Sequence, residues 1–159
     1  MRSRIERTGR GDFLVRLEPQ ERELLRTLPA QLRELLAEGD EADPSVRRLF
    51  PPAYVGDEEH EDEYRRLMGD DLREHHLQAI AIMEATIDQE QLAEGELAAW
   101  LSAIHDLRLV IGTRLDVSED EDSGAVGPDD PRAPGLTLFT YLSVLEQQVV
   151  EALASSLPG

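Results

Sequence analysis

The sequence predicts a mainly α-helical protein, a bundle of four main helices whose first helix is kinked. Apolar residues recur every three or four positions through four long segments, and two acidic connections interrupt them. A single short run alternates as a strand does, which leaves room for a small β-hairpin at the N-terminal strand. We interpret residues 12–159 as one helical domain with a mobile acidic loop at 118–135, preceded by a flexible basic tail at 1–11.

The short strand is predicted from the alternating residues Phe13–Leu17, just before Pro19. A lone strand needs a partner, and we expect one in residues 115–117 or 54–55. The tail before the strand carries four arginines and one glutamate over residues 2–10. A frayed terminus is the ordinary interpretation of such a tail, and an arm that touches nucleic acid or a partner is the alternative.

The first helix is predicted to begin at Pro19, because the amide that proline lacks would be unpaired at that position. Leucines at helical spacing continue to Glu38, and Gly39 supplies a natural stop. Pro29 interrupts this run. Since proline removes an amide donor and clashes one turn back, we expect a kink or a break near residues 27–28.

An acidic run precedes the second predicted helix. Residues Asp57–Glu63 read DEEHEDE, in which every residue except His60 is acidic. Carboxylates are favourable in the first turn of a helix because the helix dipole is positive there. The helix is then expected to extend to about Asp88, with apolar residues on its buried side.

The stretch Trp100–Val117 is the one around which we expect the chain to be organised, in a helix over about 96–114. Its buried face is predicted to hold Leu97, Leu101, Ile104, Ile111 and Leu115, widened by Trp100, Leu107 and Val110. Arg108 falls within that face, so its guanidinium either reaches solvent or meets a carboxylate. Asp106 is too near in sequence to be that partner. Gly112 favours a close helix crossing over the start of the helix end.

The last helix is predicted over Leu136–Leu157. Its core positions follow a heptad-like order at Leu138, Leu142, Leu145, Val149 and Ala152, with Phe139 and Leu153 beside them. The segment before it, Ser118–Gly135, is acidic, rich in glycine and proline and without periodicity. We therefore interpret that segment as a mobile loop, and the last helix as the element that closes the core.

Composition excludes several classes of function. The chain has 16 basic and 34 acidic side chains and a formal net charge of −18, which disfavours duplex DNA binding by the body of the protein. There is no cysteine, so disulfides, thiolate catalysis and zinc–thiolate sites are excluded. No apolar run approaches the roughly 20 residues of a membrane span, and the start lacks a secretory signal. We expect a cytoplasmic protein that does not enter a membrane.

The histidines do not predict a metal or catalytic site. His75 and His76 are adjacent, do not share a helix face and would chelate poorly. Neither the Glu-x-x-His nor the His-Glu-x-x-His spacing is present. His76 falls on the buried side of its helix and is interpreted as a satisfied or rim histidine, and His105 is isolated in sequence. We expect no cofactor, no metal and no catalytic residues.

Three motifs carry a resemblance to a known family: RLFPPAY at Arg48–Tyr54, EDEYRRL at Glu61–Leu67 and, above all, WLSAIHDLRLVIGTRL at Trp100–Leu115. They resemble the AosR-like family, long catalogued as an actinobacterial domain of unknown function, over nearly the whole chain. The resemblance implies regulation of the oxidative-stress response through binding to an extracytoplasmic-function sigma factor. It also implies a gene neighbourhood with a Clp protease adaptor. Redox control in the family is attributed to a cysteine pair, which this chain lacks, so a thiol–disulfide switch cannot operate here.

The leading hypothesis is a non-enzymatic transcriptional regulator that binds a basic surface on a sigma factor or RNA polymerase, with its negative charge steering association. The alternative is an adaptor or assembly module associated with Clp-type proteolysis, and a metal-dependent enzyme ranks last. The candidate partner-binding residues are Asp57, Glu58, Glu59, Glu61, Asp62, Glu63, Glu119, Asp120, Glu121 and Asp122. The structural residues of the central motif are Trp100, Asp106, Arg108 and Arg114. A homodimer is a further alternative, formed through an apolar stripe that the core leaves uncovered.

Overall fold

The computed structural model describes residues 3–38, 49, 58–114 and 133–155, with side chains over 3–37, 49, 72–114 and 133–155. Its elements in chain order are β1 (Ile5–Arg7), β2 (Phe13–Val15), α1 (Pro19–Glu38), α3 (Glu58–Thr86), β3 (Gln91–Leu92), α4 (Glu94–Arg114) and α5 (Ala133–Ser155). Within these ranges the chain is mainly helical, with a small antiparallel sheet near the N-terminus. The predicted fold class is confirmed.

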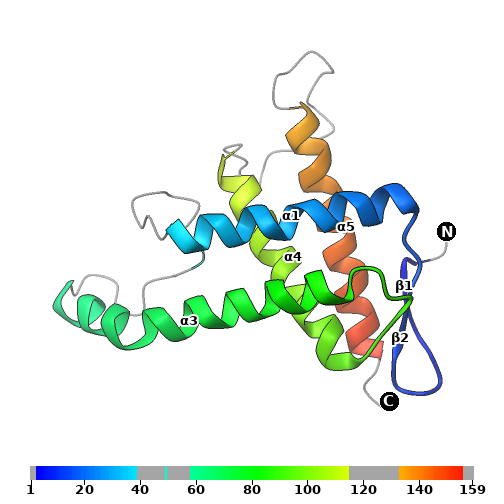
Figure 1. Cartoon of the computed structure of the whole chain (residues 1–159), viewed down its shortest axis with the longest axis horizontal. Helices are drawn as coiled ribbons and strands as arrows, with labels where there is room; N and C mark the ends of the chain where they lie inside the picture. The colour runs from blue at the N-terminus through cyan, green and yellow to red at the C-terminus, as the bar shows by residue number, and fades with distance from the viewer. Residues whose placement is uncertain (1–2, 39–48, 50–57, 115–132, 156–159) are drawn as a thin grey trace.

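The helices form two layers (Figure 1). α1 and α3 lie across the front of the view, and α4 and α5 run steeply across behind them. α4 packs extensively against both α3 and α5, whereas α1 packs mainly against α3. The N-terminal part of α3 extends beyond the other helices, and its C-terminal part crosses α4. α4 is therefore the helix that joins the two layers.

α1 and α4 begin with the same capping arrangement. Glu21 Oε2 accepts a hydrogen bond from the backbone N–H of Glu18 at 2.8 Å, and Glu96 Oε1 accepts one from the N–H of Ala93 at 2.8 Å. In both helices the carboxylate at the third position reaches back to the residue before the helix. Each carboxylate also lies at the positive end of the helix dipole, so local sequence fixes both starting points.

α1 continues through Pro29, so the expected break near residues 27–28 is wrong. Pro29 has no amide to donate one turn back, but Leu25, Leu28 and Leu32 are all buried around it. Burying a leucine contributes roughly 1.5 to 3 kcal/mol, and a proline inside a helix costs about 3 kcal/mol. Packing against the core thus outweighs the local cost. The kink stays a prediction.

The N-terminal segment corrects the prediction of a flexible tail over residues 1–11. β1 lies inside that segment and pairs antiparallel with β2, placing Ile5 opposite Val15. Both side chains are buried, at 3% and 4% exposure, so β1 is held by the core as well as by its hydrogen bonds. Gly11 closes the hairpin at a φ of 88°, in the left-handed region that glycine tolerates best.

The partners of the N-terminal strand also differ from those expected. β2 lies between β1 and β3, and Phe13 stands opposite Leu92. Both edges of β2 are therefore occupied by β1 and β3, whereas the partners that the sequence had suggested, residues 115–117 or 54–55, lie outside the described residues. Phe13 and Leu92 are both fully buried, so the central strand seals one end of the helical core.

The core is centred on α4, but its buried face is shifted from the predicted stripe. Trp100 and Ile104 are fully buried as expected, whereas Leu101 and Ile111 are half-buried. Asp106, which the predicted stripe does not include, is only 3% exposed. The shift arises because α3 and α5 cover α4 from different sides, so a single stripe cannot describe its contacts.

We expect Ile104→Ala to lower the free energy of unfolding by about 2 to 5 kcal/mol, since it empties a fully buried position. Leu101→Ala is the matched control on the same helix and should cost clearly less, because Leu101 is half-buried. Urea unfolding of the two variants checks this. Equal losses would contradict the placement of α4.

Gly112 marks the close crossing of α4 and α5 that the sequence favoured. A Cβ at this position would lie 3.0 Å from Cε2 of Phe139 on α5. The absence of a side chain therefore allows the Phe139 ring to lie against the backbone of α4. This contact explains a glycine inside a helix, where it costs about 1 kcal/mol relative to alanine.

We predict that Gly112→Ala destabilises the protein, because the Phe139 ring must move. In a Phe139→Leu background the same change should instead stabilise it, by up to about 1 kcal/mol, since only the helix propensity of alanine remains. Urea unfolding of the four proteins in this cycle gives both signs. The same sign in both backgrounds would show that the ring does not set the crossing.

Candidate functional site

The acidic residues predicted to bind a partner fall in two parts of the chain. The start of α3 holds Glu58, Glu59, Glu61, Asp62 and Glu63, where the backbone is described and the side chains are not. The others, Asp57, Glu119, Asp120, Glu121 and Asp122, lie outside the described residues. Their part in partner binding stays a prediction.

The residues interpreted as structural lie on α4, and the first of them is Trp100. Its indole Nε1–H donates to Oγ1 of Thr86 at 2.8 Å, and the Thr86 hydroxyl donates in turn to the carbonyl of Ile82 at 2.7 Å. Trp100 is fully buried and Thr86 is 4% exposed. The ring thus fills the core while its polar edge joins α4 to the end of α3.

Asp106 pairs with His76 across the α3–α4 contact. His76 Nδ1 lies 2.6 Å from Oδ2 of Asp106, and His76 Nε2 lies 3.1 Å from the carbonyl oxygen of Leu49. Burial lowers the pKa of His76, but the Asp106 carboxylate and the Leu49 carbonyl outweigh that effect and leave the pKa raised. The interpretation of His76 as a satisfied histidine is confirmed, and its partner is one that sequence reasoning missed.

Arg108 meets a carboxylate, which is one of the two outcomes that its position predicted. Its Nη1 lies 2.8 Å from Oε2 of Glu146, and its Nε donates to Oγ of Ser143 at 2.9 Å. Glu146 also lies 2.7 Å from Nδ1 of His105 through its other oxygen. Both acceptors belong to α5, so this group joins α4 to α5. Arg114 ends α4 as an exposed cation at the negative end of the dipole.

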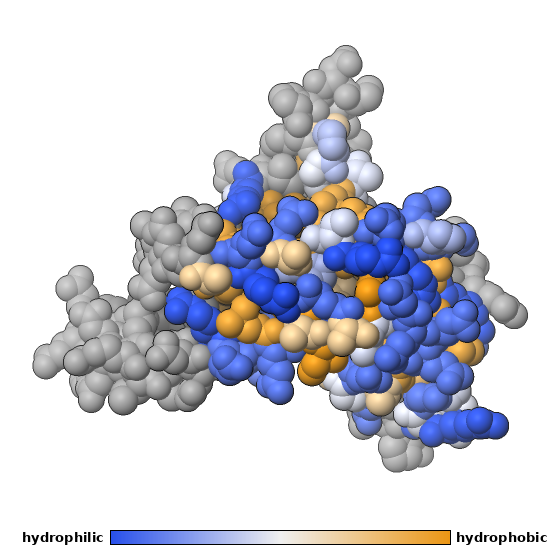
Figure 2. Space-filling view, in the orientation of Figure 1, coloured by the Kyte–Doolittle hydropathy of each residue, from blue (hydrophilic) through white to orange (hydrophobic). Residues whose placement is uncertain are grey.

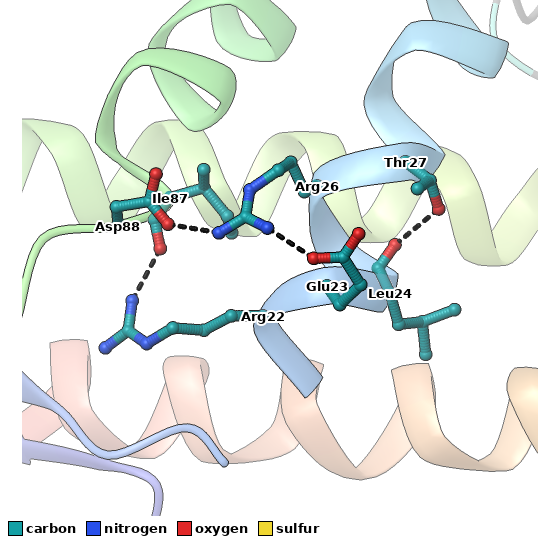
Figure 3. Close-up of polar contacts among 7 residues, drawn as sticks. All are labelled: Arg22, Glu23, Leu24, Arg26, Thr27, Ile87 and Asp88. Carbon is teal, nitrogen blue, oxygen red and sulfur yellow. Dashed lines mark hydrogen bonds and ion pairs between the residues drawn. The ribbon is translucent and has the colours of Figure 1, made fainter. Parts of the chain in front are cut away.

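Two arginines of α1 hold the turn that follows α3 (Figure 3). Arg22 donates to the carbonyl of Ile87, and Arg26 binds the carboxylates of Glu23 and Asp88. Arg22 also donates to the carbonyl of Gln89. These contacts connect α1 to the chain between α3 and β3. Sequence reasoning missed the contacts of Arg22 because backbone carbonyls leave no trace in residue type, and it missed the Arg26–Asp88 pair because the two residues are far apart in the sequence.

An apolar groove of about 460 Å³ lies between α1 and α5, lined by Gln20, Glu21, Leu24, Pro134, Thr137, Leu138 and Tyr141. Beside it Arg4 binds Glu21, and the Arg4 guanidinium stands 5.5 Å from the centre of the Tyr141 ring. Burial raises the pKa of Glu21, but hydrogen bonds from the Glu18 amide and Arg4 leave it lowered. The carboxylate is therefore held as an anion by the Glu18 amide and by Arg4, the residue before β1.

The face of the described residues that Figure 2 shows is mostly hydrophilic, with separate hydrophobic areas between the hydrophilic side chains. Large apolar side chains exposed by more than a third are Leu24, Val144 and Val150. The described residues contain no group of three or more histidine and acidic side chains that could hold a metal ion. None of the described helices is long and apolar enough to cross a membrane.

Known proteins match this chain over almost its whole length. The sequence model of the domain of unknown function DUF2017 matches residues 1–153. The chain belongs to this family. Proteins of Mycobacterium bovis and Mycobacterium tuberculosis, each described as oxidative stress regulator AosR, are 25% identical over 196 aligned residues, which cover 96% of this chain and 87% of theirs. No solved structure matches this DUF2017 chain.

The partners of the central motif were only partly visible in the sequence. Glu146 and Ser143 stand three residues apart on α5, which places both on one helix face towards Arg108. That spacing was a usable signal for the α4–α5 contact in this DUF2017 chain. The bond from His76 to Leu49 had no such signal, because its acceptor is a backbone carbonyl.

We predict that Thr86→Val lowers the free energy of unfolding by about 1 to 3 kcal/mol, because it leaves the buried indole N–H without its acceptor. The emission of Trp100, which is the one tryptophan of the chain, should shift as well. Thr113→Val is the matched control, since the Thr113 hydroxyl donates to the carbonyl of Leu109 in its own helix. An effect of Thr86→Val no larger than that of the control would contradict the assignment.

Proposed function

We propose that this chain is a non-enzymatic regulator of the oxidative-stress response that acts by binding a protein partner. The observation that carries the proposal is the match, over 96% of the chain, to mycobacterial proteins described as oxidative stress regulators. The polar groups of the central motif agree with it, because Asp106 and Arg108 bind neighbouring helices. They act as scaffold and are not arranged around a substrate.

The partner we propose is an extracytoplasmic-function sigma factor or RNA polymerase, met in the cytoplasm through a basic surface. A net charge of −18 attracts such a surface over a distance and accelerates association. The start of α3 supports this choice, since it is rich in carboxylates and extends beyond the other helices (Figure 1). Binding of this kind weakens as salt screens the charges.

The test is a pull-down with the tagged full chain at ~50 mM and ~500 mM salt, read by mass spectrometry. We expect a sigma factor or RNA polymerase subunit to be recovered at low salt and lost at high salt. The variant Glu58→Lys/Glu59→Lys/Glu61→Lys should lose this partner. The matched control is Glu34→Lys/Glu74→Lys/Glu90→Lys, which makes the same charge change at exposed positions elsewhere.

The outcomes separate the proposals. Loss of binding in the α3 variant alone supports the start of α3 as the contact surface. Equal loss in both variants would show that net charge, and not this surface, controls association. Recovery of a Clp chaperone in place of a transcription component would favour the adaptor function and overturn the transcriptional one. Recovery of the partner that does not change with salt concentration would overturn the electrostatic basis of the proposal.

A further inference from the structure

We propose that His76, Asp106 and the Leu49 carbonyl form a proton-dependent clamp, in which the protonated imidazole ties Leu49 to the α3–α4 pair. His76 lies on α3 and Asp106 on α4, while Leu49 belongs to the segment between α1 and α3. One imidazole therefore joins three parts of the chain. The proposal does not rest on the proposed function.

The two acceptors require a cation for both bonds to form. His76 Nδ1 lies 2.6 Å from Asp106 Oδ2, and His76 Nε2 lies 3.1 Å from the Leu49 oxygen. A carboxylate and a carbonyl can only accept, so both imidazole nitrogens must donate. Only the imidazolium carries two N–H groups. The positions of the two acceptors are therefore those that a protonated ring satisfies in full.

Loss of the proton removes one of these bonds in a defined order. The neutral ring keeps a single N–H, and the charged carboxylate is a stronger acceptor than the amide carbonyl. The remaining proton therefore stays on Nδ1 and faces Asp106. The lone pair of Nε2 then faces the lone pairs of the Leu49 oxygen, so the contact changes from attractive to repulsive. Leu49 is the part of the clamp that is released.

Burial makes this change consequential. The side chain of Asp106 is 4% exposed and that of His76 is 12% exposed, so water replaces little of what is lost. Leu49 itself is 3% exposed and belongs to the hydrophobic core. The clamp thus acts on a residue whose position the core depends on. A buried ion pair that loses one charge is strongly disfavoured, which favours the protonated state.

Of the described carboxylates, Asp106 is the one that faces His76, and the other charged groups near the pair make different contacts. On α3 itself Arg73 lies one turn before it, and the His75 ring stands edge-on with its centroid 6.1 Å away. On α1, Arg33 binds Glu84, eight residues further along α3. The charges of α5 meet α4 through Arg108, on a different contact.

The sign of the pH dependence follows from the raised pKa of His76. A group that binds its proton more tightly in the folded state stabilises that state fully below the unfolded pKa of about 6.5. This contribution is lost as the pH rises through the higher folded pKa. The clamp is therefore closed at mildly acidic pH and opens towards alkaline pH.

The test is an NMR titration of the full wild-type chain from about pH 5 to pH 9, following the histidine rings and the Leu49 methyl groups. We expect His76 to titrate above 6.5 and the Leu49 methyl signals to move with the same midpoint. Asp106→Asn should lower the His76 midpoint and place Leu49 in its alkaline state at lower pH. His75→Gln, one residue away on an exposed position, should leave both titrations in place.

A second readout is the urea midpoint of unfolding as a function of pH. The difference between the wild type and His76→Gln should shrink as the pH rises, and at mildly acidic pH it should exceed the difference for the matched control His75→Gln. Leu49 methyl signals that do not change with pH while His76 titrates would overturn the clamp. So would a His76 midpoint at or below 6.5 in the folded wild type. The wild-type titration decides even if His76→Gln does not fold.

Discussion

The structure depends on the covering of α4 by its neighbours, with α3 on one side and α5 on another. A helix in this position needs apolar residues around much of its circumference, and Trp100, Ile104 and Val110 supply them. A polar group on the covered faces of this helix, such as Asp106, is then cut off from water and must be satisfied by a neighbour, since an unpaired buried polar group is costly. This constraint turns each buried polar residue of α4 into a specific contact.

Those contacts also fix which helices meet and in which register. Apolar packing alone tolerates sliding, because any leucine-rich face can pack on another. The indole of Trp100 must reach Thr86 and the guanidinium of Arg108 must reach Glu146, and each requirement is met at one position along the neighbouring helix. Gly112 adds a steric requirement, since the Phe139 ring packs against it and a larger residue at position 112 would crowd that ring. The central motif thus specifies the packing of both layers.

The helices could be predicted from the sequence because their periodicity and caps are local properties. The same logic failed for β1, where Ile5 stands among arginines and becomes a strand residue only through its partner Val15. It also failed at Pro29, where burial of the surrounding leucines outweighs a local helix-breaking residue. The polar partners of α4 were visible only in part, because pairing between helices depends on which faces meet and on backbone acceptors such as Leu49. The acidic character of the chain follows from its composition alone. None of the described contacts tests the predicted acidic binding surface.

The distribution of charge separates what stabilises the protein from what the surplus acid can do. Described arginines before β1 and on α1 bind carboxylates within the chain, as Arg4 does with Glu21, Arg26 with Asp88 and Arg33 with Glu84. Pairs that water reaches contribute little to stability, so they align elements more than they stabilise them. The chain has 34 acidic and 16 basic side chains, and this surplus of acid adds self-repulsion to the folded state and no stability. Because the surplus lowers stability, its useful effect must lie outside the fold, and solubility is one such effect.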